Sequence, residues 1–125
     1  MDVGDVMRRD LVIVGTDTSL RKAAELMTSR KVGSAIVRTD DNPGIISERD
    51  ILRAVAEGAD PEVKTVGDYM TWDAVVAFPS WDVGKAISTM LEGGFRHLIV
   101  VDGGIEVGVL SIRDLAAQLV SKPRR

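Results

Sequence analysis

The sequence predicts an α/β (α+β) fold made of two pseudo-twofold-related copies of one β-α-β-β-α unit. The first observation is a repeat across the chain: residues 3–7 read VGDVM and residues 66–70 read VGDYM, an offset of 63 residues. The second is that short apolar runs alternate with helical patterns in both copies, which is typical of helices packed on small sheets. One copy alone is too short to bury a large core. We therefore expect residues 1–60 and 61–125 to form one compact module.

Each copy is predicted to begin with a helical turn and a first apolar strand, followed by an amphipathic helix. The helical face is marked by apolar residues at the i, i+3, i+4 and i+7 positions. A central strand, a polar turn and a further strand follow, and that strand leads directly into a second helix. The helical-face residues are Leu20, Ala23, Ala24 and Met27 in the first copy and Val83, Ala86, Ile87 and Met90 in the second. The predicted turns, first strands and central strands cover 3–7, 11–14 and 34–37, then 66–70, 74–78 and 97–101.

Composition excludes several classes of protein. The net charge of −3 and the absence of a long basic stripe argue against a nucleic-acid partner. The chain has no cysteine, which excludes disulfides, thiolate metal sites and a cysteine nucleophile. A single histidine is a poor metal-ligand set, so no metal is expected. No apolar run approaches the roughly 20 residues of a membrane span, and the acidic start does not resemble a signal peptide. We expect a cytoplasmic protein without a membrane partner.

The most informative motif occurs twice, as GIISERD over residues 44–50 and GVLSIRD over residues 108–114. The serine of each motif lies where a strand becomes a helix, and the free amides of a helix start attract phosphate. The arginine can pair with phosphate oxygens, and the aspartate can accept both hydroxyls of a ribose. The same Ser-x-x-Asp pattern is also a capping box, in which these side chains only satisfy the helix start. The residues are Ser47, Arg49 and Asp50 in the first copy and Ser111, Arg113 and Asp114 in the second.

Together with the central strands VGSAIV at 32–37 and FRHLIVV at 95–101, the two motifs resemble the CBS domain, which occurs in tandem pairs called Bateman modules. The resemblance covers residues 1–121. It implies a regulatory module that binds an adenine nucleotide (AMP first, then ADP or ATP) and forms a homodimer. Because the two copies leave no room for an output domain, we expect the module either to act on a separate protein target or to report through its own oligomeric state. S-adenosylmethionine is an alternative ligand, and a ligand-free scaffold with helix-capping motifs is the alternative function. We expect no enzyme activity, because the chain lacks a paired nucleophile and base.

The resemblance also implies two pockets, each combining the first and central strands of one copy with the motif of the other. Pocket A consists of Met7, Leu11, Val12, Val32, Gly33, Ser34, Leu110, Ser111, Arg113 and Asp114. Pocket B consists of Met70, Ala74, Val75, Phe95, Arg96, His97, Ile46, Ser47, Arg49 and Asp50. Asp50 and Asp114 are assigned to ribose, and Ser47, Arg49, Arg96, His97, Ser111 and Arg113 to phosphate. The remaining members are assigned to adenine, although the apolar ones also suit core packing. Because Arg96 and His97 add positive charge, pocket B is expected to be the tighter site.

Overall fold

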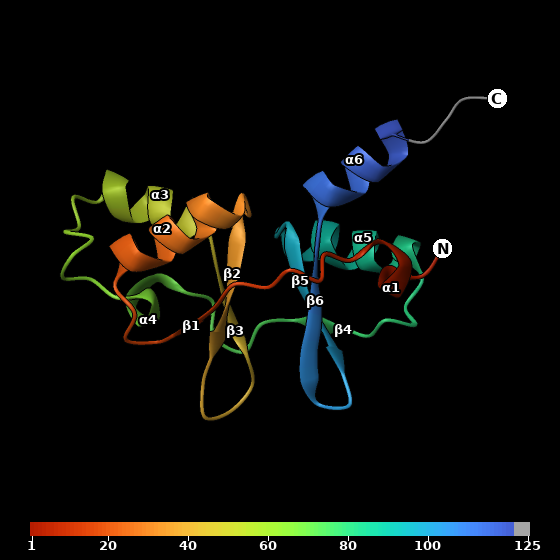
Figure 1. Ribbon diagram of the computed structural model, residues 1–125, viewed down its shortest axis with the longest axis horizontal. Coiled ribbons are helices and arrows are strands. Elements are labelled where there is room, and N and C mark those ends of the chain that lie inside the picture. The colour runs from red at the N-terminus through yellow and green to blue at the C-terminus, as the bar shows by residue number, and fades with distance from the viewer. Residues whose placement is uncertain (122–125) are drawn as a thin grey trace. The chain divides into compact units, whose positions relative to one another are not determined.

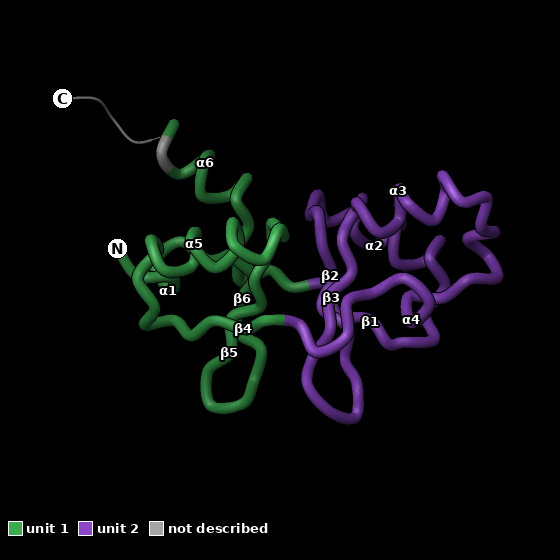
Figure 2. The backbone as a smooth tube through the Cα atoms, turned by 180° about the vertical axis from the view of Figure 1, so that it is seen from behind, with its two compact units in different colours: residues 1–11, 75–125 green, residues 12–74 purple. Residues whose placement is uncertain are grey.

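The computed structural model describes residues 1–121, which divide into two compact units (Figures 1 and 2). Unit 2 is the continuous segment Val12–Ala74. Unit 1 combines Met1–Leu11 with the chain from Val75 onward. The sequence repeat divides the chain near residue 60, so the first segment of each copy belongs to the unit that carries the sheet of the other copy.

Unit 2 contains a three-stranded sheet in the order β1-β2-β3. β1 pairs in parallel with β2, and β2 pairs in antiparallel with β3. The segment after the short helix α4 adds an isolated bridge between Thr71 and Ile45 of β3. The elements are β1 (Ile13–Gly15), α2 (Leu20–Arg30), β2 (Ser34–Arg38), β3 (Gly44–Ser47), α3 (Glu48–Ala56) and α4 (Val66–Tyr69).

Unit 1 repeats this arrangement with the sheet order β4-β5-β6. β4 is parallel to β5, and β5 is antiparallel to β6. The N-terminal segment joins this unit through an isolated bridge between Arg8 and Val109 of β6. The elements are α1 (Val3–Val6), β4 (Val76–Ala77), α5 (Val83–Gly93), β5 (His97–Asp102), β6 (Ile105–Ser111) and α6 (Ile112–Ser121). The predicted mixed α/β fold and its element order are confirmed.

Local capping explains where the long helices begin and end. The Ser19 side chain accepts a hydrogen bond from the Lys22 amide at 3.1 Å and starts α2. The equivalent helix α5 begins after Asp82, whose side chain accepts a hydrogen bond from the Gly84 amide at 2.8 Å. α2 ends at Lys31 in the left-handed conformation, with φ of 57°.

Each unit has its own apolar core. In unit 2 the predicted helical face contributes Leu20, Ala23 and Met27, all buried. In unit 1 the equivalent positions Ala86 and Met90 are fully buried. The first strands are shorter than predicted: β1 has three residues and β4 two, because each is paired with its neighbour only over that length. The part of the chain that the structure describes contains no helix with the length and apolar character of a membrane span.

Candidate functional site

Both motifs lie where a strand passes directly into a helix. β3 ends at Ser47, where α3 begins, and β6 ends at Ser111, where α6 begins. In the antiparallel register Ser47 lies opposite Ser34, and Ser111 lies opposite His97. Directly opposed residues project to the same face of a sheet. The structure therefore brings together Ser34 and Ser47 in unit 2, and His97 and Ser111 in unit 1, although the members of each pair were assigned to different predicted pockets.

The helix starts hold fewer free amides than the sequence suggested. The Glu48 amide donates to the carbonyl of Gly33 at 3.0 Å, and the Ile112 amide donates to the carbonyl of Arg96 at 3.1 Å. The third residue of each helix donates its amide to the motif serine: the distance to Oγ is 3.4 Å in α3 and 2.9 Å in α6. A phosphate at either helix start would compete with these acceptors for the same amides.

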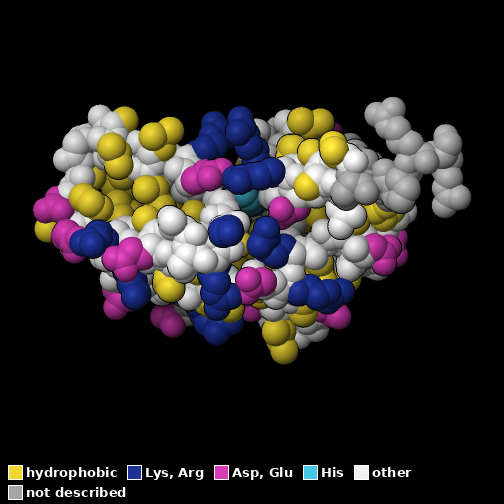
Figure 3. Space-filling model, turned by 45° about the horizontal axis from the view of Figure 1, so that its top comes forward, with side chains coloured by type: hydrophobic (Ala, Val, Ile, Leu, Met, Phe, Trp, Pro, Cys, Tyr) yellow, Lys and Arg dark blue, Asp and Glu magenta, His cyan; other side chains and the backbone are white. Residues whose placement is uncertain are grey.

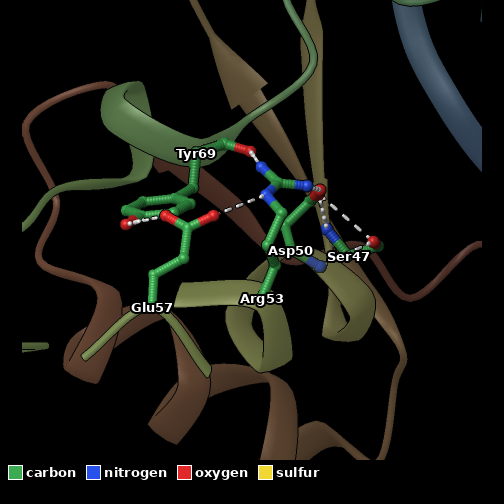
Figure 4. A network of polar contacts seen from close by, with 5 residues as sticks. All are labelled: Ser47, Asp50, Arg53, Glu57 and Tyr69. Carbon is green, nitrogen blue, oxygen red and sulfur yellow. Dashed lines mark hydrogen bonds and ion pairs between the residues drawn. The ribbon is translucent and has the colours of Figure 1, made fainter. Parts of the chain in front are cut away.

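The Asp50 carboxylate is held by several donors from its own unit (Figure 4). Its Oδ2 accepts from the Ser47 amide at 2.8 Å and from the Ser47 hydroxyl at 3.2 Å, which completes a capping box. Its Oδ1 accepts from Nη1 of Arg53 at 3.2 Å. The Asp50 side chain is only 13% exposed. In the first copy, Ser47 and Asp50 therefore form a complete capping box.

Arg53 is itself fixed by α4. Its Nη2 donates to the carbonyl of Tyr69 at 3.1 Å, and its guanidinium lies 5.4 Å from the centre of the Tyr69 ring. The Tyr69 hydroxyl donates to Oε1 of Glu57 at 3.0 Å. This hydrogen bond to a carboxylate raises the pKa of Tyr69 above its usual value. The four side chains Asp50, Arg53, Glu57 and Tyr69 thus form one connected polar network on unit 2.

The Asp114 carboxylate has a different environment. Its Oδ1 lies 3.5 Å from Nη2 of Arg8, and the two side chains are 27% and 33% exposed. Asp50 accepts a hydrogen bond from the amide of its motif serine, Ser47. Among residues 1–121, the Asp114 carboxylate accepts no equivalent bond from the Ser111 amide. Asp114 instead lines an open cavity of about 410 Å³ in unit 1, together with Val6, Met7, Arg8, Ala117 and Gln118.

The motif glycines have a structural task that the sequence did not reveal. A Cβ on Gly44 would overlap Cε of Met70 and lie 2.7 Å from the carbonyl oxygen of Thr71. A Cβ on Gly108 would lie 2.9 Å from Cγ of Met7 and 3.0 Å from the carbonyl oxygen of Arg8. Each glycine leaves room for the segment that follows a short helix, α4 at Gly44 and α1 at Gly108. This close packing holds the segment, which comes from the other sequence copy, against the sheet of its unit.

The other predicted site residues fall into two groups. The first is buried or partly buried: Met7, Val12, Ser34, Ile46, Met70 and Leu110 are buried, and Leu11, Val32, Gly33, Ala74, Phe95 and His97 are partly buried. The side chains of Met7, Val12, Ile46, Met70 and Leu110 already belong to the apolar cores. The second group is exposed at the surface and comprises Arg49, Val75, Arg96 and Arg113.

Sequence reasoning missed the two arginines beside the aspartates. Arg53 stands three residues after Asp50 on one helix, and this spacing of opposite charges is a recognisable signal for contact. Arg8 carried no such signal, because 106 residues separate it from Asp114.

Comparison with known proteins identifies the class. The family model of the CBS domain matches residues 3–57 and 66–121, so the chain belongs to the CBS domain family and carries two copies of the domain. An uncharacterised protein of Methanocaldococcus jannaschii, MJ1225, is 31% identical over 95% of this chain, which spans 43% of the length of that relative.

Solved structures show the same fold. PAE2072 of Pyrobaculum aerophilum, a CBS domain protein in complex with AMP, superposes with a TM-score of 0.82 at 28% identity, covering 98% of this chain and all of the other. The hexameric CBS-CP12 protein from bloom-forming cyanobacteria superposes with a TM-score of 0.89 at 26% identity, covering all of this chain and 76% of the other. The resemblance inferred from the two motifs is confirmed.

Proposed function

We propose that this CBS pair is a regulatory module that binds an adenine nucleotide, with AMP as the first choice, and that it performs no catalysis of its own. The observation that carries the proposal is the duplicated motif: Asp50 and Asp114 both stand three residues after a serine at a strand-to-helix junction. A carboxylate at that place can accept the two hydroxyls of a ribose. The AMP complex of PAE2072 supports the choice of ligand, since that protein aligns with this chain over nearly its whole length.

The proposed roles follow from chemistry and exposure. Asp50 and Asp114 bind ribose hydroxyls, and Ser47 and Ser111 donate to the ligand when their hydroxyls leave the cap. The exposed Arg49, Arg96 and Arg113 pair with phosphate oxygens. His97 adds a donor whose charge depends on pH. No cysteine or second histidine is present in the sequence to build a metal centre.

We also propose that the chain forms a homodimer through its helices and acts on a separate protein. Figure 3 shows hydrophobic side chains gathered at the surface over the helices. On α3 of unit 2, Leu52 and Val55 are 68% and 63% exposed, and on α5 of unit 1, Leu91 is 69% exposed. Exposed apolar side chains that recur on one element are typical of protein–protein contact. The hexameric CBS-CP12 protein supports assembly as a property of this fold.

The second candidate function is a dimerisation module that binds no ligand. The complete capping box between Ser47 and Asp50 favours it, because those side chains are then explained without a nucleotide. The two candidates differ in one measurable property, the response of the folded protein to adenosyl compounds.

Thermal unfolding with AMP, ADP, ATP, S-adenosylmethionine and no ligand tests the proposal. A ligand at 100 times its dissociation constant stabilises the folded state by about 2.7 kcal/mol, which raises the midpoint by several degrees. The matched variants are Asp50→Asn and Asp114→Asn, since the amide oxygen of asparagine can still accept a hydrogen bond at the helix start but the side chain carries no charge. A rise that is lost in these variants supports nucleotide binding. No rise with any compound at millimolar concentration refutes it and favours the dimerisation module.

A further inference from the structure

The two motif aspartates differ in the positive charge that faces them. Asp50 pairs with Arg53, which comes from the same helix. At the equivalent place in the second copy, three residues after Asp114, stands Ala117, which lines the cavity of unit 1. Asp114 is faced instead by Arg8 from the N-terminal segment, and the equivalent of Arg8 after α4 is Thr71.

The number of acceptor sites left on each carboxylate is correspondingly unequal. A carboxylate offers about four lone-pair sites, and the two hydroxyls of a ribose need two of them. Asp50 already accepts three hydrogen bonds, two from Ser47 and one from Arg53. Asp114 has one partner among the described residues, and that contact, at 3.5 Å, is long for a charge-assisted hydrogen bond.

The arginine at Asp50 is also the harder of the two to displace. Arg53 is fixed at the same time by the carbonyl and the ring of Tyr69, and the carboxylate that it contacts is 13% exposed. The Arg8 side chain is less exposed than that of Arg53, at 33% against 52%, but its contact with Asp114 is longer, at 3.5 Å against 3.2 Å, and the Asp114 carboxylate is about twice as exposed as that of Asp50, at 27%. Exposed ion pairs with poor geometry contribute little free energy, so a ligand displaces Arg8 at small expense.

We infer that Arg53 is a built-in competitor of the ligand at Asp50, and that the motif of Asp114, beside the cavity of unit 1, is therefore the stronger binding site for a ribose-containing ligand. This inference rests on the proposed function and names which of its two motifs dominates. It reverses the expectation from sequence, in which the charges of Arg96 and His97 favoured pocket B. Arg53 is a specificity-determining residue: it sets the affinity of the first motif by occupying its carboxylate.

A reciprocal exchange of Arg53 and Ala117 tests the inference. The variants are Arg53→Ala, which gives the first motif the side chain of the second, and Ala117→Arg, which does the reverse. AMP binding is measured by isothermal titration calorimetry, with stoichiometry per chain. Because an ion pair of a half-exposed arginine contributes up to about 1 kcal/mol, each exchange is expected to change the affinity of its own motif by up to about fivefold. Arg53→Ala tightens the weaker class of sites, and Ala117→Arg weakens the stronger class.

Further variants assign the classes and control for folding. Asp114→Asn is expected to weaken the stronger class and Asp50→Asn the weaker one. Arg53→Met removes the charge but keeps an apolar stem against the Tyr69 ring, and it should act like Arg53→Ala. Arg21→Ala removes an exposed arginine that pairs with Glu62 elsewhere on unit 2, and it should leave both classes unchanged.

The outcomes separate this inference from the proposed function. AMP binding that neither exchange alters, or a stronger class that depends on Asp50, overturns the inference and leaves the proposed function standing. No AMP binding by the wild type or by any variant overturns both.

Discussion

Met7 packs against Gly108 so closely that a Cβ at position 108 would lie 2.9 Å from Cγ of the methionine. The same relationship joins Met70 to Gly44 in the other unit. In each case the glycine belongs to the duplicated Gly-x-x-Ser-x-x-Asp motif, and the methionine belongs to the segment that comes from the other sequence copy. The spacing Gly-x-x-Ser-x-x-Asp therefore links two tasks, since the glycine makes room for a segment on the sheet a few residues before the aspartate that is proposed to bind ribose.

Gly108→Ala is expected to destabilise the protein by about 1–3 kcal/mol, the usual effect of forcing an extra methyl into a packed site. The methionine can shift, but the carbonyl oxygen of Arg8, 3.0 Å from the new Cβ, belongs to the backbone bridge with Val109. Urea unfolding measures the change. Gly15→Ala is the control, because its new Cβ meets only the flexible side chains of Asp17 and Thr18. An equal loss in both variants would contradict this role of Gly108.

Removal of the Asp50 side chain is expected to cost more stability than removal of Asp114, with no ligand present. Asp50→Ala deletes the acceptor of the Ser47 amide and leaves Arg53 without its carboxylate. Loss of a helix cap costs about 1 kcal/mol, and the abandoned charge adds to it. Asp114→Ala removes only the long contact with Arg8. Chemical unfolding of both variants provides the comparison, and an equal or larger loss for Asp114→Ala would show that the two motifs are capped alike.

The element order could be predicted from sequence because its signals are local. The spacing of Leu20, Ala23 and Met27 and the cap at Ser19 act within a few residues of one another. The sequence could not predict that the first segment of each copy joins the sheet of the other copy. That arrangement depends on contacts such as that of Met7 with Gly108, about a hundred residues away. The expectation from sequence that the pocket of Asp50 is the tighter one did not include Arg53, which pairs with that carboxylate in the structure.

Tyr69 provides a pH-dependent test of the network around Arg53. The hydrogen bond from its hydroxyl to Glu57 favours the protonated phenol and raises its pKa in the folded state. The stabilisation from this contact is therefore complete below the unfolded-state pKa of about 10 and is lost as the pH rises through the folded-state pKa. Because Tyr69 is the only tyrosine, the near-ultraviolet absorbance of tyrosinate reports its titration. Glu57→Gln removes the carboxylate charge and is expected to lower the pKa of Tyr69, and an unchanged titration curve would exclude this pairing in solution.

Leu52 and Val55 offer a test of the proposed homodimer. Both side chains are more than 60% exposed on the same short helix, α3. Leu52→Asp and Val55→Asp together place two charges on that face, and burying unpaired charges in an interface is strongly unfavourable. We expect the double variant to sediment as a monomer in analytical ultracentrifugation while the wild type sediments as a dimer. Val63→Asp is the control, because Val63 is equally exposed, at 69%, but lies outside the helices. Dissociation by Val63→Asp, or a dimer that survives both changes on α3, would mean that this face is not the interface.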